Sequence, residues 1–324
     1  MLDVFFYEAF EEEAQAIKRY LPASITAGFT WKTIQEQGNH NPPAPLISIR
    51  TQSIIPISYA TQIAGILTRS TGYDHIHDYL HKCQQNLPCG YLPLYCSRAV
   101  AEQTMLLWMS LLRKLPKQIQ QFTDFNRDGL TGQECQHKTL LVVGVGNIGY
   151  DVVQIGKGLG MNVLGVEIVE KHADVSYTSI DDGLSQADIV VCAMNLTSEN
   201  IGYFNYHVLK RGKPGLIFVN IARGELSPTE DLLRLLDEKS LGGVALDVYD
   251  KERELAVFLR GGNSLPENSD SLITLKLAKR PNVILTPHNA FNTQEAVERK
   301  SVHSIQQITH FLETGQFVWP VPIL

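Results

Sequence analysis

Three side chains late in the sequence could together carry out acid–base chemistry on a small carboxylic acid. Arg223, Glu252 and His288 follow one another in that order, downstream of a glycine-rich segment. A guanidinium can bind a carboxylate through paired hydrogen bonds, and an imidazole can donate or accept a proton near neutral pH. A neighbouring acid would tune the imidazole. With a cofactor to carry a hydride, these are the groups that reduction of a 2-keto acid requires.

The glycine-rich segment Gly144-Val145-Gly146-Asn147-Ile148-Gly149 predicts a dinucleotide site. It follows the apolar run 139–143 and precedes a helical pattern, and Glu167 ends a second apolar run 18 residues after Gly149. In such a segment the first glycine makes the turn, the second lets the backbone approach the pyrophosphate, and the third lets helix pack on strand. Glu167 would accept hydrogen bonds from the adenosine ribose and repel a 2′-phosphate. We therefore expect NAD rather than NADP.

The elements that must position these groups are short apolar runs that alternate with helical patterns. The expected strands are 139–143, 162–166, 188–193, 215–220, 242–246 and 282–285. Runs that are almost continuously Val, Ile and Leu are typical of strands buried on both faces of a parallel sheet. Six such strands predict a doubly wound α/β domain. Within it, Ser227-Pro228-Thr229-Glu230 predicts a capping box at a helix start, with Ser227 as the N-cap.

The first hundred residues predict a second α/β domain. Strands are expected at 4–6, 46–49 and 63–67, and a helix at 10–20. A further long helix, at 99–115, is expected to link the two domains. This helix is apolar on most sides, so it must be buried, either within the chain or against a second subunit. The segment 255–276 breaks the alternation and is predicted to be an inserted loop, whose role the sequence does not indicate.

We therefore expect two Rossmann-like or flavodoxin-like α/β domains with parallel sheets and an active-site cleft between them. The NAD-binding domain would span residues 99–292. The substrate domain would combine residues 1–98 with residues 293–324, which return to it. A chain of 324 residues is long enough for two such domains.

Composition excludes several classes of function. The net charge is −6 and Lys and Arg are not clustered, which argues against binding nucleic acid. No apolar run approaches the ~20 residues of a membrane span. The N-terminus lacks the basic start of a signal peptide, so a cytoplasmic location is expected. The cysteines are odd in number and form no CxxC motif, which predicts reduced thiols: Cys83, Cys89, Cys96, Cys135 and Cys192.

A group of histidines precedes the middle of the chain. His75, His77, His81 and Cys83 lie close in sequence, and His77 and His81 could share one face of a helix. No acidic or cysteine partner completes a tetrahedral set with the usual spacing of zinc ligands. We therefore predict a solvated helix face and no metal.

Taken together, the motifs resemble those of the D-isomer-specific 2-hydroxyacid dehydrogenases, closest in look to the D-lactate dehydrogenase branch. The similarity covers nearly the whole chain and rests on segments 71–74, 144–149, 220–224, 246–249 and 286–291. It implies that Arg223 binds the substrate carboxylate and keto oxygen. It also implies that His288 is the proton donor in reduction and the base in oxidation, and that Glu252 contacts His288 and stabilises its imidazolium form.

The resemblance implies further contacts. Backbone amides at Thr71 and Gly72 would hold the substrate carboxylate, Tyr95 and Phe291 would surround the substrate, and Arg50 could select an acidic tail. Cofactor contacts would come from Met194, Asn195, Asn200, Ile221, Ala222, Asp247 and Asn289. Family members form dimers, so a homodimer is expected, as is specificity for the D-isomer.

The sequence departs from the family at three places. Arg253 follows Glu252 where the family usually has Pro, which leaves Asp250 and Glu254 as alternatives to Glu252. Met194 and Asn195 stand where an apolar residue and Pro are common, so that loop could differ in shape. Glu167 replaces the commoner Asp, which should move the ribose contact by about one methylene.

Three functions are therefore open. An NAD-dependent D-2-hydroxyacid dehydrogenase acting on a D-lactate-like substrate is favoured. A phosphoglycerate- or hydroxypyruvate-type dehydrogenase is supported by Arg50 and disfavoured by Tyr95 and Phe291. An NAD-sensing, corepressor-like binding protein would share the fold but would not turn over substrate.

Overall fold

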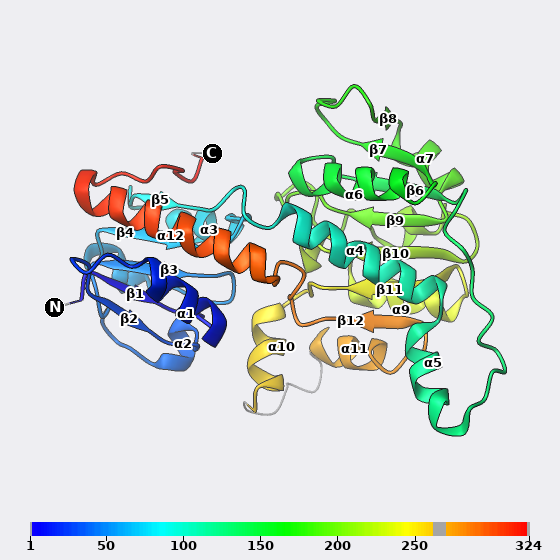
Figure 1. Ribbon diagram of the computed structural model, residues 1–324, viewed down its shortest axis with the longest axis horizontal. Coiled ribbons are helices and arrows are strands. Elements are labelled where there is room, and N and C mark those ends of the chain that lie inside the picture. Colours follow the sequence, from blue (N-terminus) through cyan, green and yellow to red (C-terminus); the bar gives the residue numbers. More distant parts are fainter. Residues whose placement is uncertain (1, 262–269, 323–324) are drawn as a thin grey trace. The chain divides into compact units, whose positions relative to one another are not determined.

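The computed structural model describes residues 2–261 and 270–322 (Figure 1). The chain divides into two compact units. One unit comprises Met1–Cys96 and Asn292–Leu324, and the other comprises Ser97–Phe291. We call them the terminal unit and the central unit. Each is built on a parallel sheet, as expected for this α/β class.

The central unit contains a seven-stranded parallel sheet in the order β12-β11-β10-β9-β6-β7-β8. Its strands are β6 Thr139–Val143, β7 Asn162–Val166, β8 Ser176–Tyr177, β9 Ile189–Cys192, β10 Leu216–Asn220, β11 Leu241–Leu246 and β12 Val283–Leu285. The doubly wound sheet is confirmed, and all six predicted strands are present. Strand β8 was not predicted, because two residues at the edge of a sheet are too short to give an apolar pattern.

Helices cover both faces of this sheet. They are α4 Ser97–Leu112, α5 Leu115–Gln121, α6 Asn147–Gly158, α7 Ile180–Gln186, α8 Tyr206–Leu209, α9 Thr229–Asp237, α10 Glu252–Leu259 and α11 Asp270–Leu277. Helices α4 and α6 lie across one face (Figure 1). Leucines of α7, α8, α9 and α11 pack on the other face, against alternate strand residues such as Leu141, Val190 and Phe218. Much of α4 is buried, including Trp108, and the helix packs against α6, β10 and β11.

Two local predictions in the central unit were wrong. The segment 255–276 is helical at both ends, in α10 and α11, while residues 262–269 lie outside the described residues. The capping box at Ser227 does not form, since α9 begins after Pro228 without a side-chain cap. Instead, the Ser227 hydroxyl accepts a hydrogen bond of 2.8 Å from the Asn220 side chain. A buried tertiary partner therefore outweighed the local capping pattern.

The terminal unit contains a five-stranded parallel sheet in the order β2-β1-β3-β4-β5. Its elements are β1 Val4–Phe6, α1 Glu11–Tyr20, β2 Ala27–Phe29, α2 Ile34–Gln37, β3 Leu46–Ile49, β4 Gly65–Thr68, α3 Asp74–Cys83, β5 Cys89–Gly90 and α12 Gln294–Thr314. The C-terminal helix α12 packs beside α1. A β-carbon at Gly65 would lie 2.5 Å from the Phe311 ring, so glycine is what lets α12 lie against β4.

Three general features of the described residues bear on function. Each of the five cysteines is a free thiol, as predicted. Within residues 2–261 and 270–322, no helix has the length and apolar character needed to span a bilayer. The same residues contain no group of three or more His, Cys, Asp or Glu side chains arranged to hold a metal ion.

The prediction of a solvated histidine face was wrong for His75, which is only 5% exposed.

Candidate active site

The glycine-rich turn joins β6 to α6 in the central unit, and its three glycines differ in surroundings. A β-carbon at Gly144 would lie 2.5 Å from the Met194 backbone nitrogen, and one at Gly149 would lie 1.9 Å from the Gly144 carbonyl oxygen. Both positions therefore require glycine for packing, and Gly144 also has a φ of +93°. At Gly146 a β-carbon would have no heavy atom within 4 Å. Gly146 thus borders open space rather than protein.

The surroundings of Gly146 fit a dinucleotide. Helix α6 begins there with no side-chain cap and no acidic residue in its first turn, where Asn147 and Ile148 lie. Its first amides and partial positive charge suit a pyrophosphate. The Glu167 carboxylate, at the end of β7, accepts hydrogen bonds of 2.8 Å from the backbone N–H groups of Val145 and Ile168. This holds an acid beside the turn, where a ribose would bind.

The loop after β9 borders the same turn. Met194 is in contact with Gly144 through its backbone, and Asn195 follows it. The Asn200 side chain donates to the Asn195 carbonyl at 2.7 Å and accepts from the Thr197 backbone N–H at 2.8 Å. Asn200 therefore closes this loop on itself, so its side chain shapes the loop.

Adjacent strands bring the predicted catalytic residues to one edge of the sheet. Strands β10, β11 and β12 are parallel neighbours. Arg223 follows β10, Glu252 follows β11 and His288 follows β12. The carboxyl ends of parallel strands meet at the same edge, which is where ligands bind in open α/β sheets. The glycine-rich turn follows β6 at that same edge.

The turn that carries Arg223 is held by its own sequence motif. The buried Asn220 side chain donates to the Arg223 carbonyl at 2.8 Å and accepts from the Ala222 N–H at 3.0 Å, and Ile221 is buried between them. A β-carbon at Gly224 would lie 1.8 Å from the Tyr249 carbonyl carbon. Only glycine lets this turn pack on the turn after β11. Sequence reasoning assigned no role to Asn220 or Gly224, although both lie in the quoted motif.

Asp247 ties the turn after β12 to the end of β11. Its carboxylate accepts hydrogen bonds from the backbone N–H groups of Asn289 and Ala290, at 2.8 and 2.9 Å, and from the Thr286 hydroxyl at 2.5 Å. Burial raises the pKa of Asp247, although its hydrogen bonds and nearby His288 favour the ionised form. Asp247 thus shapes the segment that carries His288. Thr286 is a further contributor that sequence reasoning did not single out.

His288 and Glu252 form a direct pair. The Nδ1 atom of His288 lies 2.7 Å from Oε1 of Glu252, the first residue of α10, and both side chains are less than one-fifth exposed. His288 has a left-handed backbone, with φ of +50°, which few residues other than glycine adopt. With Nδ1 engaged by the carboxylate, Nε2 is the ring atom available for proton transfer. Phe291, the last residue of the central unit, is 6% exposed.

The predicted substrate residues of the terminal unit also follow adjacent strands. Arg50 follows β3, Thr71 and Gly72 follow β4, and Tyr95 follows β5. The buried Glu8 carboxylate accepts hydrogen bonds from backbone N–H groups of the loop that begins at Arg50. Tyr95 is 4% exposed, and burial raises its pKa well above the ordinary value, so its hydroxyl stays protonated.

The loop at Thr71 and Gly72 presents unused amide donors. The backbone N–H groups of Thr71, Gly72 and Tyr73 donate to no acceptor in the described part of the chain. These residues immediately precede α3. Successive amides before a helix can bind an anion, so the loop could hold a carboxylate.

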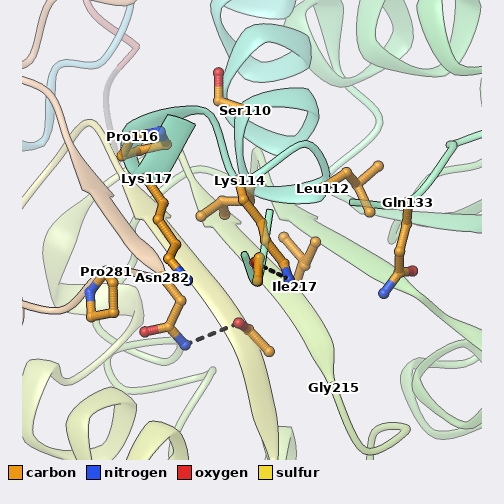
Figure 2. Close-up of a pocket in the computed structure, with 13 residues that line it drawn as sticks. Ser110, Leu112, Lys114, Pro116, Lys117, Gln133, Gly215, Ile217, Pro281 and Asn282 are labelled. Carbon is orange, nitrogen blue, oxygen red and sulfur yellow. Dashed lines mark hydrogen bonds between the residues drawn. The ribbon is translucent and has the colours of Figure 1, made fainter. Parts of the chain in front are cut away.

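Figure 2 shows a cavity of about 260 Å³ in the central unit. It is lined by residues at the amino ends of β10, β11 and β12, including Gly215, Gly242 and Asn282. Lys114 and Lys117 extend into it and donate to the backbone carbonyls of Gly129 and Asp128. Because the sheet is parallel, this cavity lies at the opposite edge from the glycine-rich turn and His288.

A dinucleotide turn and an imidazole–carboxylate pair on one edge of a doubly wound sheet are features of an NAD-dependent oxidoreductase. Comparison with known proteins narrows this class. Residues 105–290 match the model of the D-isomer specific 2-hydroxyacid dehydrogenase NAD binding domain. The chain belongs to this family and is an NAD-dependent D-2-hydroxyacid dehydrogenase, acting on a CH–OH group.

Individual relatives agree with this assignment. The chain is 30% identical to a D-lactate dehydrogenase of Streptococcus agalactiae, over 94% of this chain and 95% of the relative. It is 31% identical to an aromatic 2-oxoacid reductase of Clostridium sporogenes, over 77% and 76%. Its fold is similar to that of D-lactate dehydrogenase from Aquifex aeolicus, solved with NAD and lactic acid, with a TM-score of 0.82, 26% identity and coverage of 98% and 99%.

Proposed function

We propose that this dehydrogenase interconverts a small, D-lactate-like 2-hydroxy acid and its 2-keto acid. The observation that carries the proposal is the His288–Glu252 pair, at the sheet edge that also carries Arg223 and the dinucleotide turn. Relatives named for D-lactate and for aromatic 2-oxoacids support a small acid with an aliphatic or aromatic tail. Bound NADH supplies the hydride that reduces C2.

Each residue has a defined part in the reaction. The Arg223 guanidinium binds the carboxylate and keto oxygen, and the amides of Thr71 and Gly72 bind the same carboxylate. His288 gives its Nε2 proton to the keto oxygen during reduction and takes it back during oxidation. Glu252 orients the ring through Nδ1 and stabilises the imidazolium. Tyr95 and Phe291 surround the substrate tail.

The cofactor is held by this chain's own backbone and polar groups. The amides near Gly146, Asn147 and Ile148 bind the pyrophosphate, and Glu167 binds the ribose hydroxyls. Gly144 and Gly149 complete the turn after β6. The remaining contacts come from the turns after β9, β10, β11 and β12, through Met194, Asn195, Asn200, Ile221, Ala222, Asp247 and Asn289. Their shared place at the carboxyl edge of one sheet supports the assignment.

A substrate with an acidic tail is a second candidate, favoured by Arg50 in the terminal unit. The Arg50 guanidinium and the Lys300 ammonium lie 5.9 and 5.6 Å from the centre of the Phe10 ring. Lys300 is also 5.7 Å from the ring of Tyr95. Because Lys300 is fully buried and paired with Glu13, Arg50 is the cation that would favour a second carboxylate or a phosphate, as on a phosphoglycerate- or hydroxypyruvate-type substrate.

NADH oxidation across a panel of acids tests both candidates. The panel contains pyruvate, longer aliphatic and aromatic 2-keto acids, hydroxypyruvate, 3-phosphohydroxypyruvate and 2-oxoglutarate. We expect the highest kcat/KM with an uncharged tail, and a loss of about 100-fold or more in His288→Gln and Arg223→Lys. The exposed His207→Gln and Arg127→Lys are matched controls. A preference for charged tails that Arg50→Ala removes would establish the second candidate.

The predicted homodimer has support in the central unit. Ile119, Phe122 and Phe125, in and just after α5, are 67%, 74% and 74% exposed. Large apolar side chains grouped on a surface mark interaction sites, and a second copy is the expected occupant. Light scattering should show a dimer. Phe122→Glu should dissociate this dimer, whereas Trp31→Glu in the terminal unit should leave it intact.

The cytoplasmic location remains a prediction.

A further inference from the structure

A buried chain of hydroxyl groups links His75 to the loop at Thr71 and Gly72. The Nε2 atom of His75 lies 2.9 Å from the Thr68 hydroxyl oxygen, which lies 2.7 Å from the Ser70 hydroxyl oxygen. The Ser70 hydroxyl in turn donates to the Gly72 carbonyl at 2.7 Å. His75, Thr68 and Ser70 are all less than 9% exposed. The chain therefore runs from the first turn of α3, past the end of β4, to the loop.

The Gly72 carbonyl, at the end of this series of hydroxyl groups, determines which atom donates in each hydrogen bond of the series. A carbonyl oxygen can only accept a hydrogen bond, so Ser70 must donate its single hydroxyl proton to the Gly72 carbonyl. Thr68 must then donate its own hydroxyl proton to the Ser70 oxygen. The Thr68 oxygen has no further proton and can only accept a hydrogen bond from His75. The contact between Thr68 and His75 can be a hydrogen bond only if His75 carries a proton on Nε2. The three contacts together therefore require a proton on Nε2 of His75.

The buried hydroxyl groups act on the loop at residues 71–73, which would hold the substrate carboxylate. It turns the Gly72 carbonyl toward the interior, while the N–H groups of Thr71, Gly72 and Tyr73 donate to no described acceptor. The Thr71 hydroxyl, which donates to the Leu92 carbonyl at 3.2 Å, secures the other side of the loop. If the Gly72 peptide rotated, its carbonyl oxygen would turn toward the substrate carboxylate and repel it.

We propose that His75 is a positioning residue for substrate binding, which acts through Thr68 and Ser70 to keep the amides of residues 71–73 directed at the substrate carboxylate. The inference rests on the proposed function of that loop. It assigns no contact between His75 and substrate. Its signature is therefore a change in KM for the keto acid rather than in kcat or in cofactor affinity.

Kinetics of three variants test this inference. Thr68→Val removes one hydroxyl with almost no change of shape, Ser70→Ala removes the donor to Gly72, and His75→Met removes the Nε2 donor. Each should raise KM for the best keto acid about 5- to 10-fold, the effect of one neutral hydrogen bond, and leave kcat within about twofold. His75→Gln, which can again present an N–H, should recover most of the loss. Exposed His81→Met is the matched control.

Coupling between the variants separates one connected chain from three independent structural defects. Because one break already disconnects Gly72 from His75, Thr68→Val combined with His75→Met should raise KM no more than either change alone. Multiplied effects would overturn the inference, as would an unchanged KM in all three single variants. NADH affinity, measured by fluorescence, reports on the central unit and should not change.

A direct observation of the proton completes the test. Nitrogen-15 NMR of the imidazoles in the wild-type protein should show His75 protonated at Nε2. A tautomer with its proton on Nδ1 alone would overturn the inference, even if a variant failed to fold. If no 2-keto acid were reduced by the wild-type protein, the proposed function would fail, while the tautomer would still report on the chain itself.

Discussion

Two glycines of the dinucleotide turn should respond in opposite ways to the same added methyl group. At Gly149 a β-carbon would lie 1.9 Å from the Gly144 carbonyl oxygen and 2.9 Å from its carbon. Both atoms are backbone, so they cannot move without displacing the turn. At Gly146, whose φ of −77° suits alanine, a β-carbon would meet nothing within 4 Å. Packing therefore requires glycine at position 149, whereas only a bound ligand would require glycine at position 146.

The expected magnitudes follow from these contacts. Gly149→Ala should lower the free energy of unfolding by about 3 kcal/mol or more, the upper range of overpacking costs. Gly146→Ala should change it by less than about 1 kcal/mol, since only the helix cap is affected. Its methyl group would instead occupy the approach of the pyrophosphate. Losing charge-assisted hydrogen bonds of about 1.5–3 kcal/mol would weaken NADH binding roughly 10- to 150-fold.

Urea unfolding of each variant and fluorescence titration with NADH measure the two quantities separately. We expect a stable Gly146→Ala protein that binds NADH poorly, and a Gly149→Ala protein that is destabilised before any ligand is added. Wild-type affinity in Gly146→Ala would refute the placement of the pyrophosphate at this turn. Wild-type stability in Gly149→Ala would refute the close packing of α6 on the turn.

Two further predictions concern acidic side chains. Glu252→Gln keeps an oxygen beside Nδ1 of His288 but removes the charge. We therefore expect kcat to fall about 100-fold, while fluorescence titration shows unchanged NADH affinity. An unchanged kcat would exclude Glu252 as the acid that assists His288. In the terminal unit, Oε1 of Glu13 lies 2.8 Å from Arg69 Nε and 2.7 Å from Lys300 Nζ, with all three side chains fully buried. Burial lowers the pKa of Lys300 to about 7, so Arg69 is the partner that stays charged throughout. Glu13→Gln should cost about 3–5 kcal/mol in urea unfolding, because it leaves the buried Arg69 cation unpaired. Burial alone would raise the pKa of Glu13, but these two cations outweigh it and hold the pKa at about 2, below the ordinary 4.5. The stability from Glu13 is thus present above pH 4.5 and lost as the pH falls toward 2, so the gap between wild type and Glu13→Gln should narrow there; a constant gap would contradict the ionised pair.

The sequence alone was sufficient for features that depend on neighbouring residues. The strands of the central unit are continuous apolar runs, because both faces of the sheet are covered, and this pattern needs no knowledge of the partners. The glycine spacing and the order of Arg223, Glu252 and His288 are likewise local, since each follows one strand. Their meeting at one edge follows from the parallel sheet, which the alternation of strands and helices predicted.

Tertiary structure decided what depends on partners far away in the chain. Strands β2, β5 and β8 have the sequences Ala-Gly-Phe, Cys-Gly and Ser-Tyr, which form no apolar run, so pairing with neighbours creates them rather than their own pattern. Ser227 matched a capping box, but the buried Asn220 amide engaged its hydroxyl instead. His75 occupied a polar helical pattern, yet the helix buries it against Thr68. Local patterns report which surface a segment can present, whereas the surrounding chain determines which polar groups lose water and must find partners.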